Sequence, residues 1–306
     1  MSSLDAALQR ALSVRLNLQI SLSQLPIIEE WMDIHLDRWL EHNPMPPEMP
    51  SGEQSTYLAM LGSDLRRMWW GAWGDPRGFV PKLADYFKLC NIAKTDAALL
   101  DQIGEQLEPA QVGSWIAVWG GKVITGWHFW DRYPWTAIDP LFGEHEAKRK
   151  LAKLIAEHQI EHVQRFAQSI GEAPFSELEL ALPERSVDEQ VRLGSAACAQ
   201  LTGAPLDERV LAQLARAQEP ALAISVRIRG GAISRVGVIA SKLTLSDAEQ
   251  LCSAATTPFD PKLAKLIGAL GGAPSRVEYG RAGDRAGVDL YVEPNHTAPA
   301  KPAEAN

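Results

Sequence analysis

The chain has 306 residues, and 30 Lys and Arg against 38 Asp and Glu give it a formal net charge of −8 at pH 7. This acidic balance argues against a protein that follows nucleic-acid phosphates or binds a membrane through a basic patch. Because no run of about 18 apolar residues and no secretory signal pattern occurs, we expect a soluble, cytoplasmic protein without a membrane span. The three cysteines, Cys90, Cys198 and Cys252, are too few and too widely spaced for a disulfide framework or a metal-binding knot, so we expect reduced, buried thiols. Composition does not indicate an oligomeric state.

All ten tryptophans lie in the first 135 residues. Indole rings supply large apolar surfaces together with N–H groups that need partners. The concentration favours either a heavy aromatic core or an aromatic-lined pocket for a flat ligand, an unsaturated ligand or a cation.

The first half of the chain predicts helices and two hairpins. Apolar residues at helical spacing predict helices at 27–39, 80–90 and 94–106. Residues 55–76 fit a helix or a hairpin, and we prefer the hairpin because of their glycines and aromatic density. Aromatic and β-branched runs on both sides of a Gly-Gly pair predict a second hairpin at 112–135.

The second half alternates in the same way within one domain, residues 1–294. A charged amphipathic pattern predicts one long helix over 144–170, and strict alternation predicts a strand over 175–183. Further helices are expected at 187–202, 206–217 and 244–270, and hairpins at 223–242 and 276–294. We expect residues 295–306 to be a disordered tail.

This order predicts an α+β fold: a closed antiparallel β-barrel of about ten strands, built from repeated αββα units with the helices outside. Closure removes the exposed sheet edges and leaves an inward face that can be polar. In the hairpin at 223–242, Ile224, Val226 and Ile228 would then pack on helices, while Arg227 and Arg229 would point into the lumen. Several enclosed guanidiniums repel one another unless an anion joins them, and Arg binds phosphate oxygens in a bidentate manner. In an open sheet the same alternation would be a solvated face.

Two stretches carry a resemblance to a known family. AISVRIRGGAISRVGVIASK (223–242) and YGRAGD (279–284) resemble the fourth and last hairpins of the αββα (ABBA, or PT-barrel) aromatic prenyltransferases of the soluble bacterial type. The resemblance implies transfer of a prenyl group from an allylic diphosphate to a small aromatic acceptor inside the barrel. It also implies that no cofactor and no Mg²⁺ is required, with the prenyl diphosphate as co-substrate.

The resemblance assigns roles to particular residues. Asp289 falls near a carboxylate that orients the acceptor, and we expect it to act with Tyr279 and Tyr291 as the catalytic set. Residues expected to hold the diphosphate are Arg235, Arg227, Arg229, Lys242 and Arg67, with Arg66 as the alternative to Arg67. Residues expected to form the aromatic pocket are Trp127, Phe129 and Trp69.

The chain also departs from the family pattern. It has Thr125-Gly126-Trp127 and Gly287 at about the places of two diphosphate-binding lysines. Arg235 and Lys242 are seven residues apart, so a regular strand would put them on opposite faces unless a bulge intervenes. A second hypothesis is therefore the same barrel without a diphosphate site, which binds an aromatic ligand or catalyses a different reaction.

Two other interpretations are weighed beside these. A third hypothesis is an interaction protein whose Trp-rich half is a partner surface. His158 and His162 spell the HxxEH pattern of some zinc sites, but their charged surroundings are more typical of a solvated helix face, and we predict no metal ligand.

Overall fold

The structure is a computed structural model. It describes residues 56–65, 67–77, 94–119, 122–170, 174–216, 222–261, 263–264, 267 and 274–293. The helices predicted at 27–39 and 80–90 and the predicted tail at 295–306 lie outside these residues, as does Arg66.

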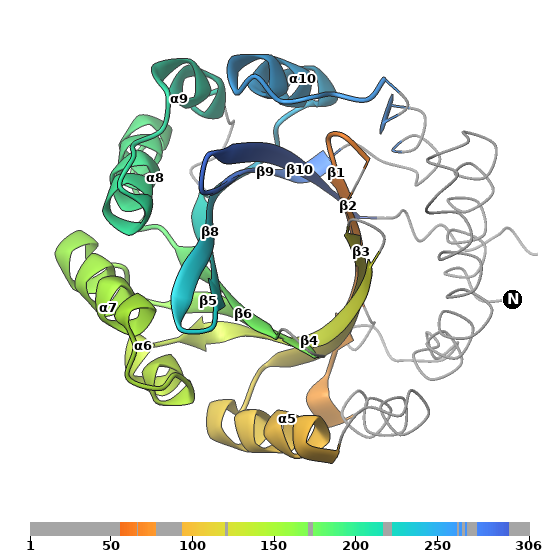
Figure 1. Ribbon diagram of the computed structural model, residues 1–306, viewed down its shortest axis with the longest axis vertical. Helices are drawn as coiled ribbons and strands as arrows, with labels where there is room; N and C mark the ends of the chain where they lie inside the picture. The colour runs from red at the N-terminus through yellow and green to blue at the C-terminus, as the bar shows by residue number, and fades with distance from the viewer. Residues whose placement is uncertain are drawn as a thin grey trace, which may run out of the picture.

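Ten antiparallel strands form the centre of the molecule (Figure 1). The order around the sheet is β1-β10-β9-β8-β7-β6-β5-β4-β3-β2, and because β1 pairs with both β2 and β10, every strand has two hydrogen-bonded neighbours in a closed barrel. The strands are β1 (Thr56–Gly62), β2 (Arg67–Gly74), β3 (Gln111–Trp119), β4 (Lys122–Tyr133), β5 (Val163–Ile170), β6 (Phe175–Ala181), β7 (Ala223–Arg229), β8 (Ala232–Ser241), β9 (Pro274–Ala282) and β10 (Arg285–Val292). The antiparallel hairpins expected at 55–76, 112–135, 223–242 and 276–294 are confirmed.

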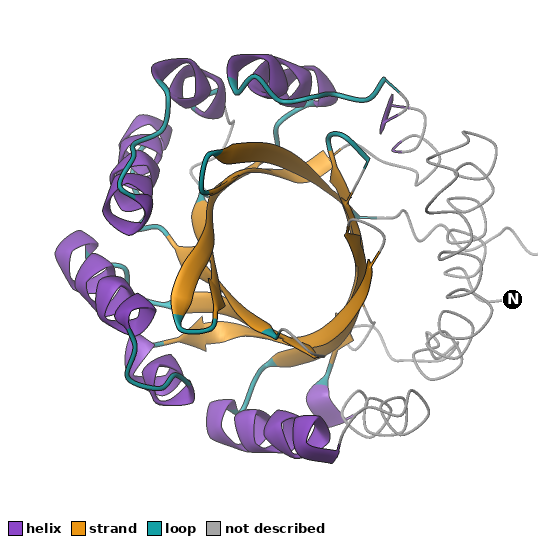
Figure 2. Ribbon diagram, in the orientation of Figure 1, coloured by secondary structure: helices purple, strands orange, loops and turns teal. Residues whose placement is uncertain are grey.

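The described helices lie outside the ring of strands (Figure 2), as the sequence predicted. They are α5 (Lys94–Leu107), α6 (Trp135–Ile138), α7 (Glu146–His158), α8 (Val187–Thr202), α9 (Glu208–Leu214) and α10 (Leu245–Ala254), with a short 3₁₀ turn η2 at Asp139–Leu141. None of the helices in the described ranges combines the length and the apolar character that crossing a bilayer requires.

Local sequence signals determine where these helices begin. Ser186 caps α8 by accepting from the backbone N–H of Glu189, whose side chain accepts in return from the backbone N–H of Ser186. Thr244 and Asp247 form the same reciprocal capping box at the start of α10. Such boxes satisfy two backbone donors that a helix start leaves free.

The long helix predicted over 144–170 is wrong in its second half. Helix α7 ends at His158, and Gln159 follows with φ 55°, a left-handed conformation that stops the helix. Strand β5 then begins at Val163 and pairs with β4 and β6. The third repeat therefore has two strands rather than one.

The main apolar core lies between the outer face of the sheet and the helices. Ile224, Val226 and Ile228 of β7 belong to it, as predicted, together with Leu151 of α7 and Leu251 of α10. The opposite face of each strand points into the lumen. A register shift between Arg227 and Ile228 lets β7 and β8 keep Arg227 and Arg235 directly paired across the two strands. This pairing brings both arginines to the inward face.

Candidate functional site

The lumen has one wall of aromatic and apolar side chains. Met60, Trp69, Trp115, Phe175 and Tyr291 pack together there, and each is at most 8% exposed. The Trp69 and Trp115 ring centroids lie 6.4 Å apart, and Trp115 stacks on Phe175 at 5.9 Å. Aromatic rings offer flat apolar faces with negative π density. The wall therefore suits a flat or cationic group.

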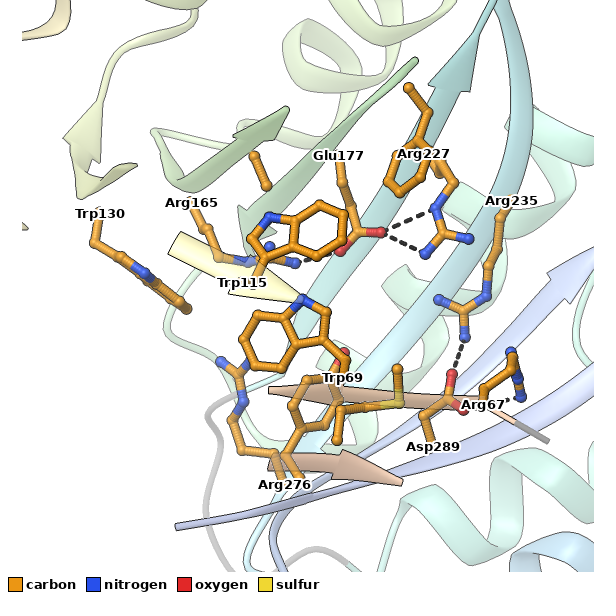
Figure 3. A pocket seen from close by; sticks show the side chains of 14 residues that line it. Arg67, Trp69, Trp115, Trp130, Arg165, Glu177, Arg227, Arg235, Arg276 and Asp289 are labelled. Atoms are coloured by element: carbon orange, nitrogen blue, oxygen red, sulfur yellow. Dashed lines mark hydrogen bonds and ion pairs between the residues drawn. The ribbon is translucent and has the colours of Figure 1, made fainter. Parts of the chain in front are cut away.

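Facing this wall, Arg235 of β8 is the centre of a first group of ion pairs. Its guanidinium donates to Glu278 of β9 and, over 2.7 Å, to Asp289 of β10. Asp289 also pairs with Arg67 of β2 at 2.8 Å, and Figure 3 shows its carboxylate between the two guanidiniums. Glu278 accepts in addition from the Tyr291 hydroxyl at 2.7 Å. The aromatic wall and the charged wall thus meet at Tyr291.

A second group of ion pairs lies on β5, β6, β7 and β9. Glu177 accepts from Arg165 and, at 2.8 Å, from Arg227. Glu179 accepts from Arg165 at 3.1 Å and from Arg276 at 2.6 Å. Buried charges persist when they are paired and hydrogen-bonded, and each of these carboxylates bridges two guanidiniums.

The lumen shifts the pKa values of its carboxyls in two directions. Burial alone would raise the pKa of Glu177, but its two guanidinium partners outweigh burial and hold that pKa well below the ordinary value. The pKa of Glu179 is lowered for the same reason, again against the effect of burial. For Asp289, burial wins over both of its guanidinium partners and raises the pKa. Of these three carboxyls, Asp289 is the one whose charged form is least favoured.

Two glycines make room for the guanidiniums of the first group. A Cβ at Gly280 of β9 would lie 2.2 Å from Nη2 of Arg235, and a Cβ at Gly287 of β10 would lie 2.5 Å from Nη2 of Arg67. Both distances are far inside van der Waals contact, so each guanidinium lies directly on a strand backbone. Gly287 is also the position where the resemblance would place a lysine, and Arg67 brings a cation to that place from β2.

The described part of the barrel contains a small inner cavity and a larger cleft. The inner cavity, between the aromatic wall and the ion pairs, has a volume of about 30 Å³, which holds about two water molecules. The cleft has a volume of about 670 Å³ and lies where the β1–β2, β7–β8 and β9–β10 turns end the barrel. We call this cleft, together with its lining residues, the mouth cleft. The mouth cleft has the size of a small-molecule site.

The mouth cleft is strongly cationic. Its described lining includes one carboxylate, that of Asp64, and five arginines: Arg67, Arg227, Arg229, Arg235 and Arg285. Arg67, Arg227 and Arg235 line the inner cavity as well. The two spaces therefore share their arginines, with open cationic surface on one side and aromatic rings on the other.

Seven of the sequence-predicted site residues line these two spaces: Arg67, Trp69, Arg227, Arg229, Arg235, Asp289 and Tyr291. Arg229 is exposed at the rim and lines the mouth cleft but not the inner cavity. The prediction of an aromatic-lined cavity holds for Trp69, and Trp115 and Trp130 line it too. The roles proposed for these residues stay predictions.

Trp127 and Phe129 do not face the lumen, and their predicted place in the aromatic pocket is wrong. Both belong to the core under the helices, and Phe129 is the nearest neighbour of Gly104 on α5. The neighbouring residue on β4, Trp130, lines the inner cavity instead. The reason is strand parity, because residues two apart share a face.

Tyr279 and Lys242 also lie outside the lumen. Tyr279 pairs with Val238 across β9 and β8, and Val238 packs against Gly194 of α8, so Tyr279 faces the helices. Its predicted place in the catalytic set inside the lumen is wrong. Lys242 follows the last residue of β8, is exposed, and has a φ of 56°. Because β8 ends at Ser241, the alternation of faces along a strand does not extend to Lys242.

The sequence interpretation missed most of the charged residues that pair with one another inside the lumen. Arg165 was hidden in the helix predicted over 144–170. Glu177, Arg276 and Glu278 stand at alternating positions of strands that were correctly predicted, and extending the parity argument to these strands would have placed them inside. Glu179 stands two residues after Glu177 on the same strand, so the same argument applies to it.

The remaining sequence features fall into place around the barrel. Cys198 on α8 and Cys252 on α10 are buried free thiols, whereas Cys90 lies outside the described residues. His158 is the last residue of α7 and lies 3.3 Å from Gln200, and His162 follows after the helix has ended, so the two do not share a helix face. Within the described ranges, no three His, Cys, Asp or Glu side chains are grouped so that they could hold a metal ion.

In sequence, this chain is weakly similar to a curated protein. No protein-family model matches it. One curated relative is a PH domain-containing protein of Dictyostelium discoideum, 23% identical over 263 residues, with 83% of this chain and 57% of that protein in the match. The chain thus spans little more than half the length of this relative.

The structure is similar to solved structures of one class. The antiparallel αββα barrel is the fold of aromatic prenyltransferases, and this chain has that fold, as the resemblance implied. A 5-dimethylallyltryptophan synthase from Streptomyces coelicolor matches with a TM-score of 0.65 and 12% identity over 97% of this chain and 98% of its own. The prenyltransferase NotF matches with a TM-score of 0.65 and 10% identity over 94% and 93%. The prenyltransferase PriB, in complex with L-tryptophan and dimethylallyl thiolodiphosphate, matches with a TM-score of 0.60 and 11% identity over 100% and 99%.

Proposed function

We propose that this protein binds an allylic diphosphate in the mouth cleft and transfers its prenyl group to a small aromatic acceptor. The observation that carries the proposal is the junction of the two spaces. Five arginines surround a cleft of ligand size, and three of them continue into a cavity walled by aromatic rings. Structures of the same fold that bind tryptophan and a dimethylallyl diphosphate analogue support the substrate classes.

The proposed chemistry divides between the two walls. Guanidiniums bind phosphate oxygens and stabilise the diphosphate as the allylic C–O bond breaks. The faces of Trp69 and Tyr291 would shield the allylic cation from water until the acceptor ring attacks it. The ring would then lose a proton to the released diphosphate, which restores its aromaticity. A cleft with five guanidiniums and one described carboxylate repels a divalent cation, so we propose that binding does not require Mg²⁺.

The test is binding of dimethylallyl thiolodiphosphate by calorimetry, with EDTA and with Mg²⁺. We compare wild type with the double variant Arg229→Ala/Arg285→Ala, because both side chains are exposed at the rim and their loss leaves the barrel interior intact. The expected result is a loss of about tenfold or more in affinity, since each removed guanidinium gives up charge-assisted hydrogen bonds. Arg192→Ala, an exposed change on the outside of α8, is the matched control. Equal affinity in all three proteins, or no binding of any prenyl chain length, rules out the proposal.

A second candidate function is binding of an anionic or aromatic ligand without prenyl transfer. Two observations favour it. The inner cavity of about 30 Å³ is small for a five-carbon group, and four carboxylates already pair with the five arginines that line it. Binding of the analogue without turnover of dimethylallyl diphosphate, over a panel of indoles and phenols, would support this candidate.

The third hypothesis, a Trp-rich partner surface, loses support in the described part of the chain. Trp69, Trp115 and Trp127 are at most 8% exposed, and Trp130 and Trp135 are half-buried. These side chains serve the lumen and the core.

A further inference from the structure

Asp289 holds two of the arginines that line the mouth cleft. Its Oδ1 lies 2.8 Å from Nη2 of Arg67, and its Oδ2 lies 2.7 Å from Nη2 of Arg235. The Asp289 side chain is 2% exposed, whereas that of Arg67 is 27% exposed. An anion that enters from the cleft therefore meets guanidiniums whose inner sides already bind a carboxylate.

The other carboxylates of the lumen are placed differently. Asp289 binds two of the arginines that line the mouth cleft, whereas Glu177 binds one of them, Arg227, and Glu179 binds none. Glu278 binds Nη1 of Arg235, so this arginine keeps a partner if Asp289 turns away. Asp289 is thus the carboxylate that competes most directly with a ligand anion, and its release does not strip Arg235 of charge compensation.

A phosphate group on Arg67 and Arg235 would put two anions on the same two guanidiniums in a water-poor space. Coulomb repulsion between like charges is strong where the dielectric constant is low, and a like charge favours the protonated form of a carboxyl. Protonation of Asp289 removes the repulsion and converts the carboxylate into a neutral hydrogen-bonding group.

The surroundings of Asp289 favour this proton uptake. Burial already raises its pKa, and Glu278 on β9 adds to the rise. The opposing groups are Arg67 on β2, Arg235 on β8 and Arg227 on β7. An anion bound to Arg67 and Arg235 offsets their positive charge, and it therefore weakens most of the effect that lowers the pKa of Asp289. The charge of Asp289 also adds to the pKa of the Cys252 thiol on α10, which is raised mainly by its own burial.

We propose that Asp289 is an internal competitor for the anion of the mouth cleft, and that it takes up a proton when an anion replaces it on Arg67 and Arg235. This inference rests on the proposed anion site and adds its regulation: affinity for a diphosphate falls as pH rises, because binding requires a proton. Asp289 acts here as a positioning residue for the two arginines, and its charged form lowers the affinity for an anion.

The experiment is calorimetry of dimethylallyl thiolodiphosphate binding near pH 7 in two buffers of different ionisation enthalpy. We expect wild type to take up close to one proton more per bound ligand than Asp289→Asn does. Because both proteins bind the same ligand, the difference between them does not contain the ligand's own ionisation. Over the range in which Asp289 titrates, the affinity of wild type should fall up to tenfold per pH unit relative to the variant. Asp289→Asn should also bind the analogue more tightly at pH 8. Asp101→Asn, an exposed change on α5, should match wild type in all three measurements.

The possible outcomes separate the two proposals. Equal proton uptake and parallel pH profiles in wild type and Asp289→Asn overturn the inference while leaving the anion site in place. Absence of binding in every protein overturns the proposed function, and the inference with it. If Asp289→Asn does not fold, proton uptake by wild type, corrected for the known ionisation of the ligand, decides the matter: a value near zero overturns the inference.

Discussion

The contact between Gly280 and Arg235 gives a prediction whose sign depends on the structure. A glycine in the middle of a strand is ordinarily less stable than alanine by about 0.5–1 kcal/mol, so Gly280→Ala would be stabilising at a neutral site. Here the new Cβ would lie 2.2 Å from Nη2 and 2.4 Å from Cζ of Arg235. The guanidinium must move, although Glu278 and Asp289 hold it. Breaking a buried ion pair costs about 3–5 kcal/mol, and we therefore expect Gly280→Ala to lower the free energy of unfolding by about 2–4 kcal/mol.

The assay is urea unfolding at pH 7, with Gly143→Ala as the control because nothing lies within 4 Å of a Cβ there. The control should be unchanged or slightly more stable. In an Arg235→Met background, where no guanidinium lies against the strand, Gly280→Ala should cost little, which a double-mutant cycle measures as coupling between the two positions. If Gly280→Ala is as stable as wild type, or if the cycle shows no coupling, the position of Arg235 on the strand backbone is wrong.

Three further predictions concern the buried ionisable groups. Glu177→Gln leaves two buried guanidiniums short of their carboxylate and should lower the free energy of unfolding by about 3–5 kcal/mol. The exposed Glu157→Gln should change it little, and equal effects of the two would contradict the ion-pair network. Because the pKa values of Glu177 and Glu179 are lowered from 4.5, their stabilisation is present above that pH and is lost as the pH falls through the folded-state values. The urea midpoint of wild type should therefore drop between pH 5 and about pH 3, with a shallower drop in Glu177→Gln, and parallel curves would refute this. Burial raises the pKa of the Cys198 thiol to about 12, so in a Cys90→Ser/Cys252→Ser background it should react with a thiol reagent at pH 8 only at the rate of unfolding. Rapid labelling of that native protein would show that Cys198 is accessible.

The fold was predictable from sequence where the two faces of a strand differ in chemistry. In β7, Ile224, Val226 and Ile228 alternate with polar residues, and the structure has the predicted face outward. In β4 the sequence pattern does not show which face is inward, because Trp127 and Phe129 face the helices while Trp130 faces the cavity. Aromatic residues on both faces satisfy either orientation, so sequence could not choose between them.

The site was predictable only in part because its partners are far apart in the chain. Arg276 and Glu179 are 97 residues apart and meet only once the barrel has formed. Local patterns indicate which side chains face inward, but pairing across a lumen depends on the register of all the strands between them. Arg165 escaped even the local pattern, since β5 has polar residues on both faces and follows a charged helix without a glycine or proline to mark the change.

The pairing of β1 with β10 has a consequence for how the protein is made. Ala59 lies beside Val292, at opposite ends of the described chain, so the ring can be completed only when the last hairpin has left the ribosome. Until then β1 and β8 carry unpaired edges, which can join other chains. We therefore expect truncation just before the last hairpin to produce insoluble material rather than a smaller, stable protein.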